Sequence, residues 1–425
     1  MLLTEYRLEF TIQALRAVLP LKHPADAALR HFFQGGKLGS KERALAAETV
    51  FGVLRHRLFL EHACTDPEVA SKRATPRRLA LAYWIRFGGY NLRELEPLLR
   101  PDEKKWLGEV KGTDMAALPL SLQAELPEWI IDKLHAGGSD DQAILALGRA
   151  MQQPAPLDLR VNTLLSAREE VLRQFAAEGI DAVPTHWSPI GVRLRSKPAL
   201  NKHLLFLGGK VEVQDEGSQL LGFLLAPKRN DMVVDFCAGA GGKTLMLGAL
   251  MKSQGRLYAF DVSEKRLNNL KPRLKRSGLS NLHPQLIAHE NDQKVKRLAG
   301  KIDRVLVDAP CSGLGTLRRN PDLKFRQSPQ SIEELTQKQA GILAAASRLV
   351  KPGGRLVYAT CSPLPQENRD IVDAFLAGHP DFSLRPANEI LRQQLIELDT
   401  GDCLQLLPQL HGTDGFFAAV LERSK

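Results

Sequence analysis

The sequence is short of cysteine, and this shortage excludes several classes of site. Its five cysteines stand at positions 64, 237, 311, 361 and 403 of 425 residues. None belongs to a C-x-x-C pair or lies beside paired histidines at the spacing of a zinc site. Five cysteines are also too few for a disulfide framework in a chain of this length. We therefore expect free thiols in a reducing cytoplasm and no bound metal.

The sequence also lacks a long apolar run. Runs such as Leu204–Leu207 fall far short of the roughly 20 residues that a membrane helix needs. The first ten residues carry Glu5 and Glu9 and have no extended apolar core, which disfavours a secretory signal. We expect no membrane partner and a cytoplasmic location.

Acidic residues are fewer than basic ones. The chain has 58 Lys and Arg against 48 Asp and Glu, a net charge of +10. Such an excess favours a polyanionic partner, because basic side chains neutralise phosphates, but a solvated basic surface explains it as well. The stretch 193–210 is an example, since it either faces a nucleic acid or is a solvated face. Its five basic residues, with no acidic one among them, are Arg193, Arg195, Lys197, Lys202 and Lys210.

Changes in the spacing of apolar residues divide the chain into four predicted parts. Residues 1–115 show helical spacing, as at Leu8, Ile12 and Leu15, and a second helix is expected to start with Ser40 as its cap. Residues 116–150 form a helical connector interrupted at Gly137-Gly138. Residues 151–228 form a small α+β region with strands at 157–161 and 191–194 and a helix at 167–178. Residues 229–425 form a larger α/β domain.

Short apolar runs alternate with helical segments in residues 229–425. Runs of this kind fit strands buried on both faces of a parallel sheet, and the alternation predicts a doubly wound α/β fold. The five runs are 232–236, 257–260, 286–288, 304–307 and 355–359. Ligands bind beyond the carboxyl ends of such strands, so the residues that follow each run are candidates for a site.

A glycine-rich loop follows the first run. It reads Cys237, Ala238, Gly239, Ala240, Gly241, Gly242, Lys243, Thr244. A P-loop would need glycine at 237, and a dinucleotide fingerprint starting at Gly239 would need glycine at 244, so neither motif fits. Asp261 ends the next run, where an acid can hold ribose hydroxyls. An adenosine without a pyrophosphate, as in S-adenosylmethionine, suits this pattern. A turn with no ligand is the alternative.

Acids and cysteines follow the remaining runs. The third run is followed by Glu290 and Asp292, which compete for one role, and we favour Asp292. Asp308 ends the fourth run, Cys311 follows it, and Cys361 follows the fifth. A thiolate that adds to carbon 6 of cytosine makes carbon 5 able to accept a methyl group, and a nearby carboxyl group at the ring nitrogen favours the addition. A lone cysteine at a strand end is usually structural, but two are harder to explain in that way.

These motifs together closely resemble the RNA cytosine-5 methyltransferases of the Fmu/Sun type, an RsmB-like family. The resemblance covers nearly the whole chain, including a NusB-like helical front. It is carried by residues 237–244, 308–313 (DAPCSG), 360–362 (TCS), 365–368 (PQEN), 319–324 (RNPDLK), 213–215 (VQD), 414–417 (DGFF) and 51–55 (FGVLR). It implies a Rossmann-like methyltransferase domain at 229–425, preceded by an all-α NusB-like RNA-binding domain and a small α+β RNA-recognition subdomain.

The resemblance also implies a role for each candidate residue. Cys361 would be the nucleophile, and Cys311 would assist release of the methylated RNA. S-adenosylmethionine would contact residues 237–243, Asp261, Asp292 and Asp308, with Lys243 and Asp308 also close to the base. The family often has proline where this chain has Ala240. The substrate would be RNA, by analogy small-subunit ribosomal RNA, and a monomer is favoured.

Two other functions remain open at this point. In a DNA cytosine-5 methyltransferase the cysteine after proline attacks and a glutamine follows it, but here Ser312 follows Cys311 and Cys361 would have no role. A catalytically inactive RNA-binding assembly factor could keep the fold, although the intact cysteine pair argues against it.

Overall fold

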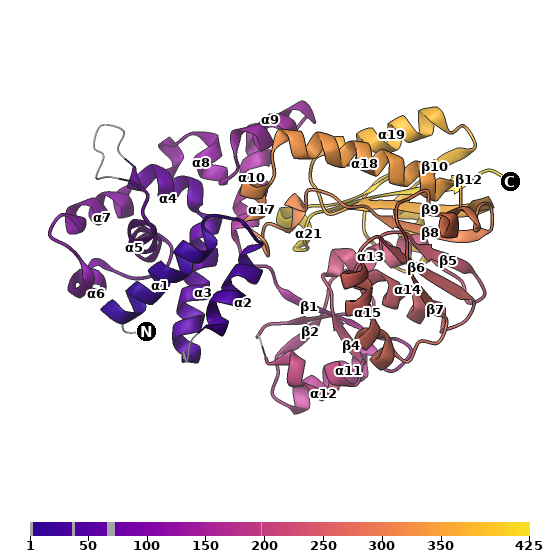
Figure 1. The fold of residues 1–425 in the computed structure, drawn as a ribbon, viewed down its shortest axis with the longest axis horizontal. Coiled ribbons are helices and arrows are strands. Elements are labelled where there is room, and N and C mark those ends of the chain that lie inside the picture. The colour runs from indigo at the N-terminus through magenta and orange to yellow at the C-terminus, as the bar shows by residue number, and fades with distance from the viewer. Residues whose placement is uncertain (1–2, 36–38, 66–72, 197) are drawn as a thin grey trace. The chain divides into compact units, whose positions relative to one another are not determined.

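The computed structural model describes residues 3–35, 39–65, 73–196 and 198–425. The chain forms two compact units. The first comprises residues up to Pro154 together with Thr316–Pro329, and the second comprises Ala155–Gly315 and Gln330–Lys425. In Figure 1 the helices of the first unit up to α10 are indigo to purple, and α17 is orange.

The first unit is built from helices around one core. Thr4 caps the first helix by accepting from the Arg7 N–H, and Leu8 and Leu15 are buried on its inner face. The helix expected near residue 40 does begin at Ser40, but its N-cap is Gly39 and no side chain caps it, so the predicted capping role of Ser40 is wrong. The helices are α1 (Glu5–Val18), α2 (Ala25–Gln34), α3 (Ser40–Arg55), α4 (Arg57–Cys64), α5 (Pro76–Arg86), α6 (Leu92–Leu95), α7 (Glu103–Gly112), α8 (Leu120–Ala124), α9 (Glu128–Ala136), α10 (Asp141–Gln152) and α17 (Leu323–Arg326).

A late segment of the chain, Thr316–Pro329, belongs to this helical unit. Lys324 on α17 is buried and donates to the carbonyls of Arg55 at 2.8 Å and Glu125 at 2.7 Å. The Glu125 carboxylate lies 3.4 Å from the same ammonium and is also buried. The four-part division predicted from the sequence does not contain this excursion, because residues 316–329 lie inside its last part.

The second unit contains a small antiparallel sheet with strand order β2-β3-β1-β4. Two of its strands and its main helix lie where the sequence predicts them. The two other strands have only three residues each, too few to show an alternating pattern. The elements are β1 (Leu157–Val161), α11 (Arg168–Ala177), β2 (Ala182–Pro184), β3 (Gly191–Leu194), α12 (Leu204–Leu207) and β4 (Val211–Val213).

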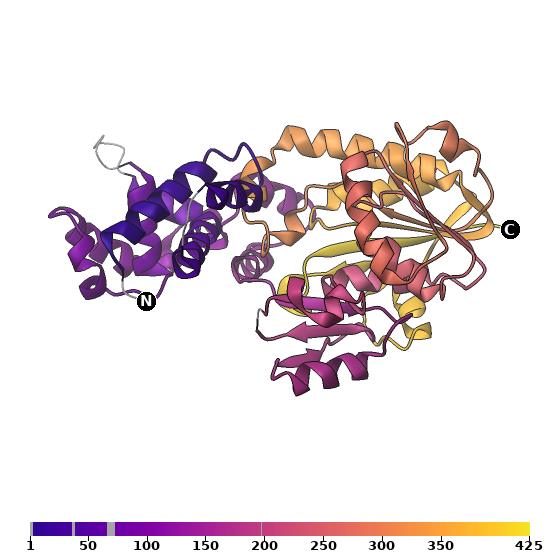
Figure 2. The same cartoon turned by 60° about the horizontal axis from the view of Figure 1, so that its bottom comes forward.

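The second unit also contains a larger sheet with strand order β10-β12-β9-β8-β5-β6-β7. Strands β5 to β9 pair in parallel, whereas β12 pairs antiparallel with β9 and β10. Figures 1 and 2 show helices on both faces of this sheet. The strands are β5 (Met232–Asp235), β6 (Arg256–Asp261), β7 (Leu282–Leu286), β8 (Ile302–Asp308), β9 (Val350–Thr360), β10 (Phe382–Arg385), β11 (Leu404–Leu406) and β12 (Phe416–Arg423).

The doubly wound prediction is confirmed for the parallel strands, with one shift. The third strand was expected at 286–288, but β7 spans Leu282–Leu286. This strand lies at the edge of the sheet and only Leu282 is buried in it, so it has no continuous apolar run. The apolar residue Ile287, which marked the expected strand, lies just after β7 and is buried in the core.

Alternate residues of the strands enter two cores, one on each face of the large sheet. Val233 lies in one core and its neighbour Val234 in the other, as the two-residue period of a strand requires. Every residue of α13 is buried, so this helix belongs to the core of the large sheet although it precedes residue 229. The helices of this part are α13 (Glu216–Leu225), α14 (Gly242–Leu250), α15 (Glu264–Ser277), α16 (Gln293–Lys296), α18 (Pro329–Ser347), α19 (Arg369–Gly378), α20 (Ala387–Gln393) and α21 (Pro408–His411).

Over the described residues, no helix has both the length and the apolar character needed to cross a bilayer.

Candidate active site

A cavity of about 500 Å³ opens at the carboxyl ends of the parallel strands. The strand order reverses at β5, whose two neighbours are β6 on one side and β8 on the other. Open α/β sheets bind their ligands at such a reversal, because the loops that follow the two strands diverge there. The cavity is lined by the loops after β5 and β8 and by the ends of β6 and β9. Its volume is that of a site for a small organic molecule.

The glycine-rich loop forms a tight turn at one end of this cavity. The Gly241 N–H donates to the Ala238 carbonyl at 2.9 Å, and Gly239 adopts a φ of 57°. A Cβ at Gly239 would have no atom within 4 Å, so the space beside the loop is open at this position. Gly241 has a φ of 81° and a Cβ there would come within 2.1 Å of Leu270, which makes its role structural. Of the predicted loop residues 237–243, all except Gly241 line the cavity.

The acids predicted to follow β6 and β7 differ in position. Asp261 lines the cavity, and its carboxylate accepts from the Gly239 N–H at 2.8 Å and the Ser263 N–H at 2.7 Å. Glu290 lines the cavity as well, whereas Asp292, the residue favoured from the sequence, is not among the lining residues. Asp292 instead caps α16 by accepting from the Lys294 N–H. The sequence motif left two acids two residues apart, and only the backbone after β7 decides between them.

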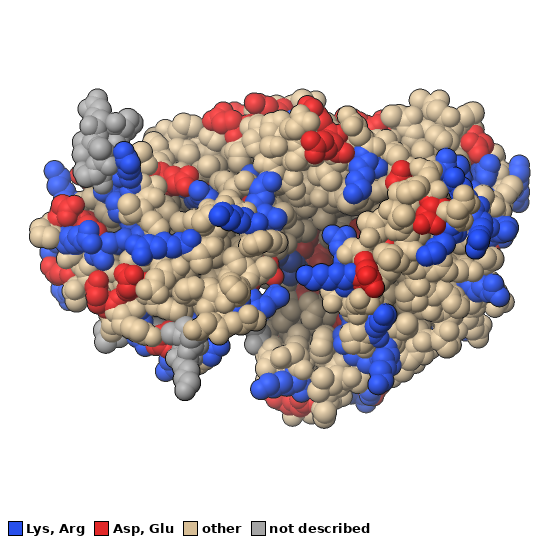
Figure 3. All heavy atoms as spheres, viewed as in Figure 1, with Lys and Arg blue, Asp and Glu red and all other residues tan. Residues whose placement is uncertain are grey.

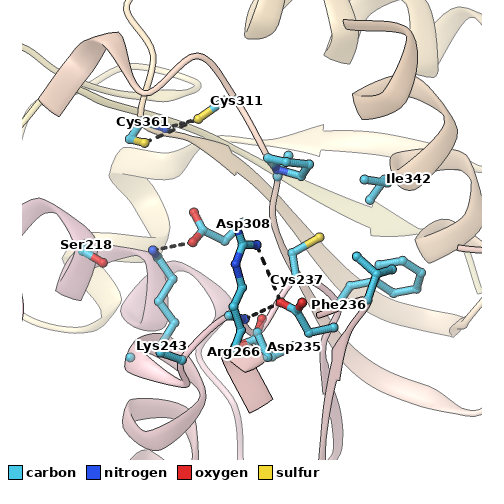
Figure 4. Close-up of a pocket in the computed structure, with 18 of the residues that line it drawn as sticks. Ser218, Asp235, Phe236, Cys237, Lys243, Arg266, Asp308, Cys311, Ile342 and Cys361 are labelled. Atoms are coloured by element: carbon cyan, nitrogen blue, oxygen red, sulfur yellow. Dashed lines mark hydrogen bonds and ion pairs between the residues drawn. The ribbon is translucent and has the colours of Figure 1, made fainter. Parts of the chain in front are cut away.

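Lys243 and Asp308 form an ion pair in the middle of the cavity (Figure 4). The Lys243 ammonium donates to the Asp308 carboxylate at 2.6 Å. Burial opposes the charge on Lys243, but the Asp308 carboxylate outweighs it and raises the pKa of the ammonium above its ordinary value. Lys243 therefore stays charged at neutral pH and can donate to a ligand in the cavity.

The two predicted cysteines meet at the other end of the cavity, where Figure 4 shows their thiols facing each other. The Sγ atoms of Cys311 and Cys361 lie 3.4 Å apart, and the Cys361 N–H donates to the Cys311 sulfur at 3.3 Å. The hydrogen bond with Cys361, together with burial, raises the pKa of the Cys311 thiol well above its ordinary value. Because the thiolate is the reactive form, this shift makes Cys311 a poor nucleophile.

A buried carboxylate joins the loops that carry the two cysteines. Glu367, which is fully buried, accepts from the Ser312 N–H at 2.7 Å and the Ser312 hydroxyl at 2.5 Å. It also accepts from the Ser362 hydroxyl and, at 3.0 Å, from the Gln339 amide. Ser312 follows Cys311 and Ser362 follows Cys361, so one side chain fixes both loops. The sequence showed Glu367 only as part of the motif at 365–368, without a role.

Other residues that line the cavity were given no role from the sequence, because most of them belong to elements without a recognisable motif. Gln214 directly follows β4, Ser218 lies on α13, and Lys338 and Ile342 come from α18. Of the lining residues without a predicted role, Val213, Gln214, Ala309 and Pro310 belonged to quoted motifs, at 213–215 and 308–313. The remaining lining residues are Asp235, Phe236, Val262, Arg266, Arg273 and Ile287.

The basic stretch at 193–210 is largely neutralised by acids from neighbouring elements. Arg193 forms an ion pair with Asp158 at 2.7 Å, and Lys210 forms one with Glu170 at 3.3 Å. Arg195 lies 3.9 Å from an Asp181 oxygen, and Lys197 lies outside the described residues. On the face shown in Figure 3, basic and acidic side chains are interspersed and form no single basic patch. Three of the four described basic residues therefore have an acidic partner already.

The described part of the chain contains no group of three or more His, Cys, Asp or Glu residues arranged to hold a metal ion. Its five cysteines are free thiols.

Comparisons with known proteins give the family. Residues 222–422 match the family described as 16S rRNA methyltransferase RsmB/F, and residues 126–201 match the RsmF/B-like ferredoxin-like domain. A ribosomal RNA small subunit methyltransferase B from Pectobacterium atrosepticum is 33% identical, over 97% of this chain and 95% of its own. The chain belongs to the RsmB/F family of ribosomal RNA methyltransferases.

Other relatives agree with this assignment. A probable ribosomal RNA small subunit methyltransferase B from Bacillus subtilis is 28% identical, over 96% of this chain and 98% of its own. A methyltransferase homologue from Pyrococcus horikoshii has a solved structure with a TM-score of 0.57 and 27% identity, covering 70% of this chain and 100% of its own. As a member of the RsmB/F family, the protein is an S-adenosylmethionine-dependent RNA methyltransferase.

Proposed function

We propose that this RsmB/F methyltransferase methylates carbon 5 of a cytosine in small-subunit ribosomal RNA through a covalent adduct on Cys361. The observation that carries the proposal is the thiol pair at the end of the cavity, 3.4 Å apart, beside the ion pair of Lys243 and Asp308. One thiol can attack while the other stays protonated. A DNA substrate is less well supported, because the relatives are ribosomal RNA methyltransferases and Ser312 follows Cys311.

The glycine turn and the strand-end acids fit S-adenosylmethionine. Gly239 leaves open space beside the loop, and each Asp261 oxygen that accepts a backbone N–H keeps a second lone pair for a ribose hydroxyl. We place Glu290 in the role first given to Asp292, because Glu290 lines the cavity and Asp292 caps a helix. When bound, S-adenosylmethionine supplies the methyl group.

The cysteines divide the covalent steps between them. The sulfur of Cys361 adds to carbon 6 of the ring as the thiolate, and the proton it gives up passes to the ring nitrogen N3. The electron pair of the 5,6 double bond moves to the 4,5 position, and the pair of the double bond between carbon 4 and N3 moves to N3. The Asp308 carboxyl and the Lys243 ammonium hold the base where carbon 5 can accept the methyl group. After transfer, the proton on carbon 5 must leave and the bond from Cys361 to carbon 6 must break. Once Cys361 is bonded to carbon 6, the hydrogen bond that raises the pKa of Cys311 is lost, so Cys311 can take the proton from carbon 5, directly or through a water molecule. The electron pair of that C–H bond re-forms the 5,6 double bond, and Cys361 leaves as the thiolate.

The rest of the chain supplies RNA affinity in this proposal. A cytosine inside a duplex is not accessible to the cysteines, so the base must be unpaired or flipped out of its stack. We assign the helical part, residues 1–115, to a NusB-like RNA-binding domain and the small antiparallel sheet to RNA recognition. Binding should weaken as salt rises, because contacts to phosphates release counterions. The reaction is assigned to the cytoplasm, in keeping with the free cysteines.

Two cysteine variants test the mechanism. Wild-type protein, labelled S-adenosylmethionine and ribosomal RNA should give labelled 5-methylcytosine. Cys361→Ala should give neither label transfer nor adduct, whereas Cys311→Ala should transfer the methyl group and then stall as a protein–RNA conjugate that survives denaturing electrophoresis. Cys403→Ala, which removes a thiol outside the cavity, is the matched control and should behave as wild type. An adduct formed through Cys311, or full turnover by both variants, would contradict the proposal.

A further inference from the structure

The glycine turn is held from outside the large sheet by an arginine of the small sheet. Arg160 on β1 is buried, and its Nη1 donates to the Gly242 carbonyl and, at 2.6 Å, to the Gln214 side-chain oxygen. Burial lowers the pKa of this guanidinium to about 10, so it stays charged at neutral pH. A buried arginine whose hydrogen bond ends on a backbone carbonyl fixes the orientation of that peptide group.

A second contact from the small sheet reaches the same turn through α15. Glu212 on β4 is buried and forms ion pairs with Arg273 at 2.9 Å and Arg276 at 2.6 Å. Arg273 also donates from Nη1 to the Ala240 carbonyl at 2.7 Å. Glu212 therefore holds Arg273 in the position from which it holds the turn.

Two alternate carbonyls of the turn, those of Ala240 and Gly242, are thus fixed by arginines. Because the peptide unit is planar, a held carbonyl also fixes the N–H group of the next residue. Gly239 and Gly241, on either side of Ala240, have positive φ values and little intrinsic preference for one conformation. The conformation of the turn must therefore come from its surroundings. The small sheet supplies one contact directly, from Arg160, and anchors the other, from Arg273, through Glu212.

We propose that Arg160 and Glu212 are positioning residues that set the conformation of the glycine turn and thereby the affinity for S-adenosylmethionine. The inference rests on the proposed placement of the cofactor at this turn. Neither residue lines the cavity, so neither is expected to touch the cofactor. The small sheet would then serve the cofactor site in addition to any role toward RNA.

Matched pairs of variants in the full-length protein separate this role from general packing. Arg160→Met removes the bond to Gly242, whereas Arg193→Met removes a partly buried ion pair of the same small sheet that does not reach the turn. Arg273→Met removes the bond to Ala240 together with a side chain that lines the cavity, so the positioning role is judged on Arg160→Met and Glu212→Gln. Arg276→Met removes the other arginine bound to Glu212, on the same helix and with similar exposure. Glu212→Gln keeps the shape of its side chain and is the milder variant if Arg160→Met does not fold.

Calorimetric titration with S-adenosylmethionine is the measurement. Losing a hydrogen bond to a charged group should raise the Kd about tenfold for Arg160→Met and Arg273→Met and less for Glu212→Gln. Arg193→Met and Arg276→Met should stay within about twofold. In turnover assays the KM for S-adenosylmethionine should rise while kcat at saturation changes much less, which a general loss of folding would not produce.

Asp261→Ala, measured alongside, distinguishes two ways of failing. If Asp261→Ala weakens binding but folded Arg160→Met and Glu212→Gln bind as tightly as wild type, the positioning role is wrong and the cofactor site stands. If Asp261→Ala also binds normally, the cofactor has been placed at the wrong site. Equal losses in Arg160→Met and Arg193→Met would also overturn the inference, because the effect would then be general to the small sheet.

Discussion

The two ends of the cavity are held in place by different means. At the cysteine end, the loops of Cys311 and Cys361 are fixed by one buried carboxylate, Glu367, through the serine that follows each cysteine. At the glycine end, the turn at Ala240 and Gly242 is held by long side chains that originate in the small sheet or are anchored there. Glu367 thus lies directly behind the two cysteines, whereas the residues that hold the glycine turn belong to the small sheet or are bound to it.

This difference follows from what each end must do. Covalent attack needs the sulfur placed within a few tenths of an ångström, and a compact network with every partner buried gives the least freedom. A cofactor must enter and leave once in every cycle, so its end must be open, and its support has to come from behind the turn. We therefore expect changes at the cysteine end to lower the rate of the chemical step and changes at the glycine end to lower affinity.

The largest expected effect is that of Glu367→Gln. The amide keeps the size of the side chain but brings a donor where Ser312, Ser362 and Gln339 already donate, so the two cysteine loops should separate slightly. A displacement near 1 Å can cost about a hundredfold in rate, so we expect a loss of that order in single-turnover methylation. The Kd for S-adenosylmethionine should not change.

A surface carboxylate supplies the control for this experiment. Glu422→Gln alters an acid paired with Arg355 outside the cavity and should leave single-turnover methylation unchanged. If folded Glu367→Gln methylates at the wild-type rate, the network behind the cysteines is only structural. If Glu367→Gln binds S-adenosylmethionine more weakly but methylates at the wild-type rate once saturated, the expected difference between the two ends of the cavity is wrong.

The acids at the glycine end should show the next largest effect. Asp261→Ala removes a carboxylate that both braces Gly239 and is proposed to hold the ribose, so the Kd for S-adenosylmethionine should rise about tenfold to a hundredfold. Glu290→Gln should weaken binding less, since it leaves an amide at the same place. Asp292→Ala should leave the Kd unchanged, because Asp292 caps α16. The reverse order for Glu290 and Asp292 in calorimetric titration would restore the residue first favoured from the sequence.

The contrast between the two ends also explains what the sequence could predict. Two of the predicted residues, Asp261 and Asp308, end parallel strands, and Cys311 and Cys361 follow such strands. Apolar runs mark these strands in the sequence, so the four residues could be predicted to meet at one site. The third acid could not be predicted in the same way, because Glu290 and Asp292 both follow the expected strand and nothing in the sequence distinguishes them. The edge strand β7 has no alternating pattern that could have decided between them.

Hydrogen bonds and ion pairs between distant elements could not be predicted from the sequence. Arg160 and Gly242 are far apart in the chain, and nothing about a single arginine in a strand indicates that it reaches a glycine turn. The same is true of Lys324, whose segment joins the helical unit rather than the domain that surrounds it in the chain. The basic stretch at 193–210 was ambiguous for a related reason, since the acids that neutralise it, such as Asp158, come from other elements.

A smaller effect, on stability rather than affinity, is expected beneath the glycine turn. Asp235, at the end of β5, is buried, and burial raises the pKa of its carboxyl to about 7, although Thr244 donates to it. The folded pKa is above the unfolded one, so the stabilising protonated form is complete at low pH and is lost as pH rises through about 7. The free energy of unfolding should therefore fall, by on the order of 1 kcal/mol between pH 6 and pH 8, on account of this group.

Asp235→Asn isolates that contribution. The amide can still accept from Thr244, and it carries no charge at any pH, so the loss of stability between pH 6 and pH 8 should shrink in urea denaturation. Asp231→Asn, a carboxylate just before β5 that is partly exposed, is the comparison and should keep the wild-type dependence. An identical pH dependence in Asp235→Asn and wild type would show that the buried carboxyl is ionised throughout.

The smallest effect is predicted for Ala240→Pro, which installs the residue often found there in the family. Ala240 has a negative φ, unlike Gly239 and Gly241 on either side, and a proline requires a negative φ. Among the described residues, none accepts a hydrogen bond from the Ala240 N–H, so the donor that proline lacks is not used. The carbonyl of residue 240 stays available to Arg273.

The Kd of Ala240→Pro for S-adenosylmethionine should stay within about twofold of the wild-type value. The free energy of unfolding should rise by roughly 0.4–1 kcal/mol, because the unfolded chain loses conformational freedom. A tenfold loss of affinity in titration would show that the turn depends on the Ala240 amide itself, and not on the carbonyls that the arginines hold.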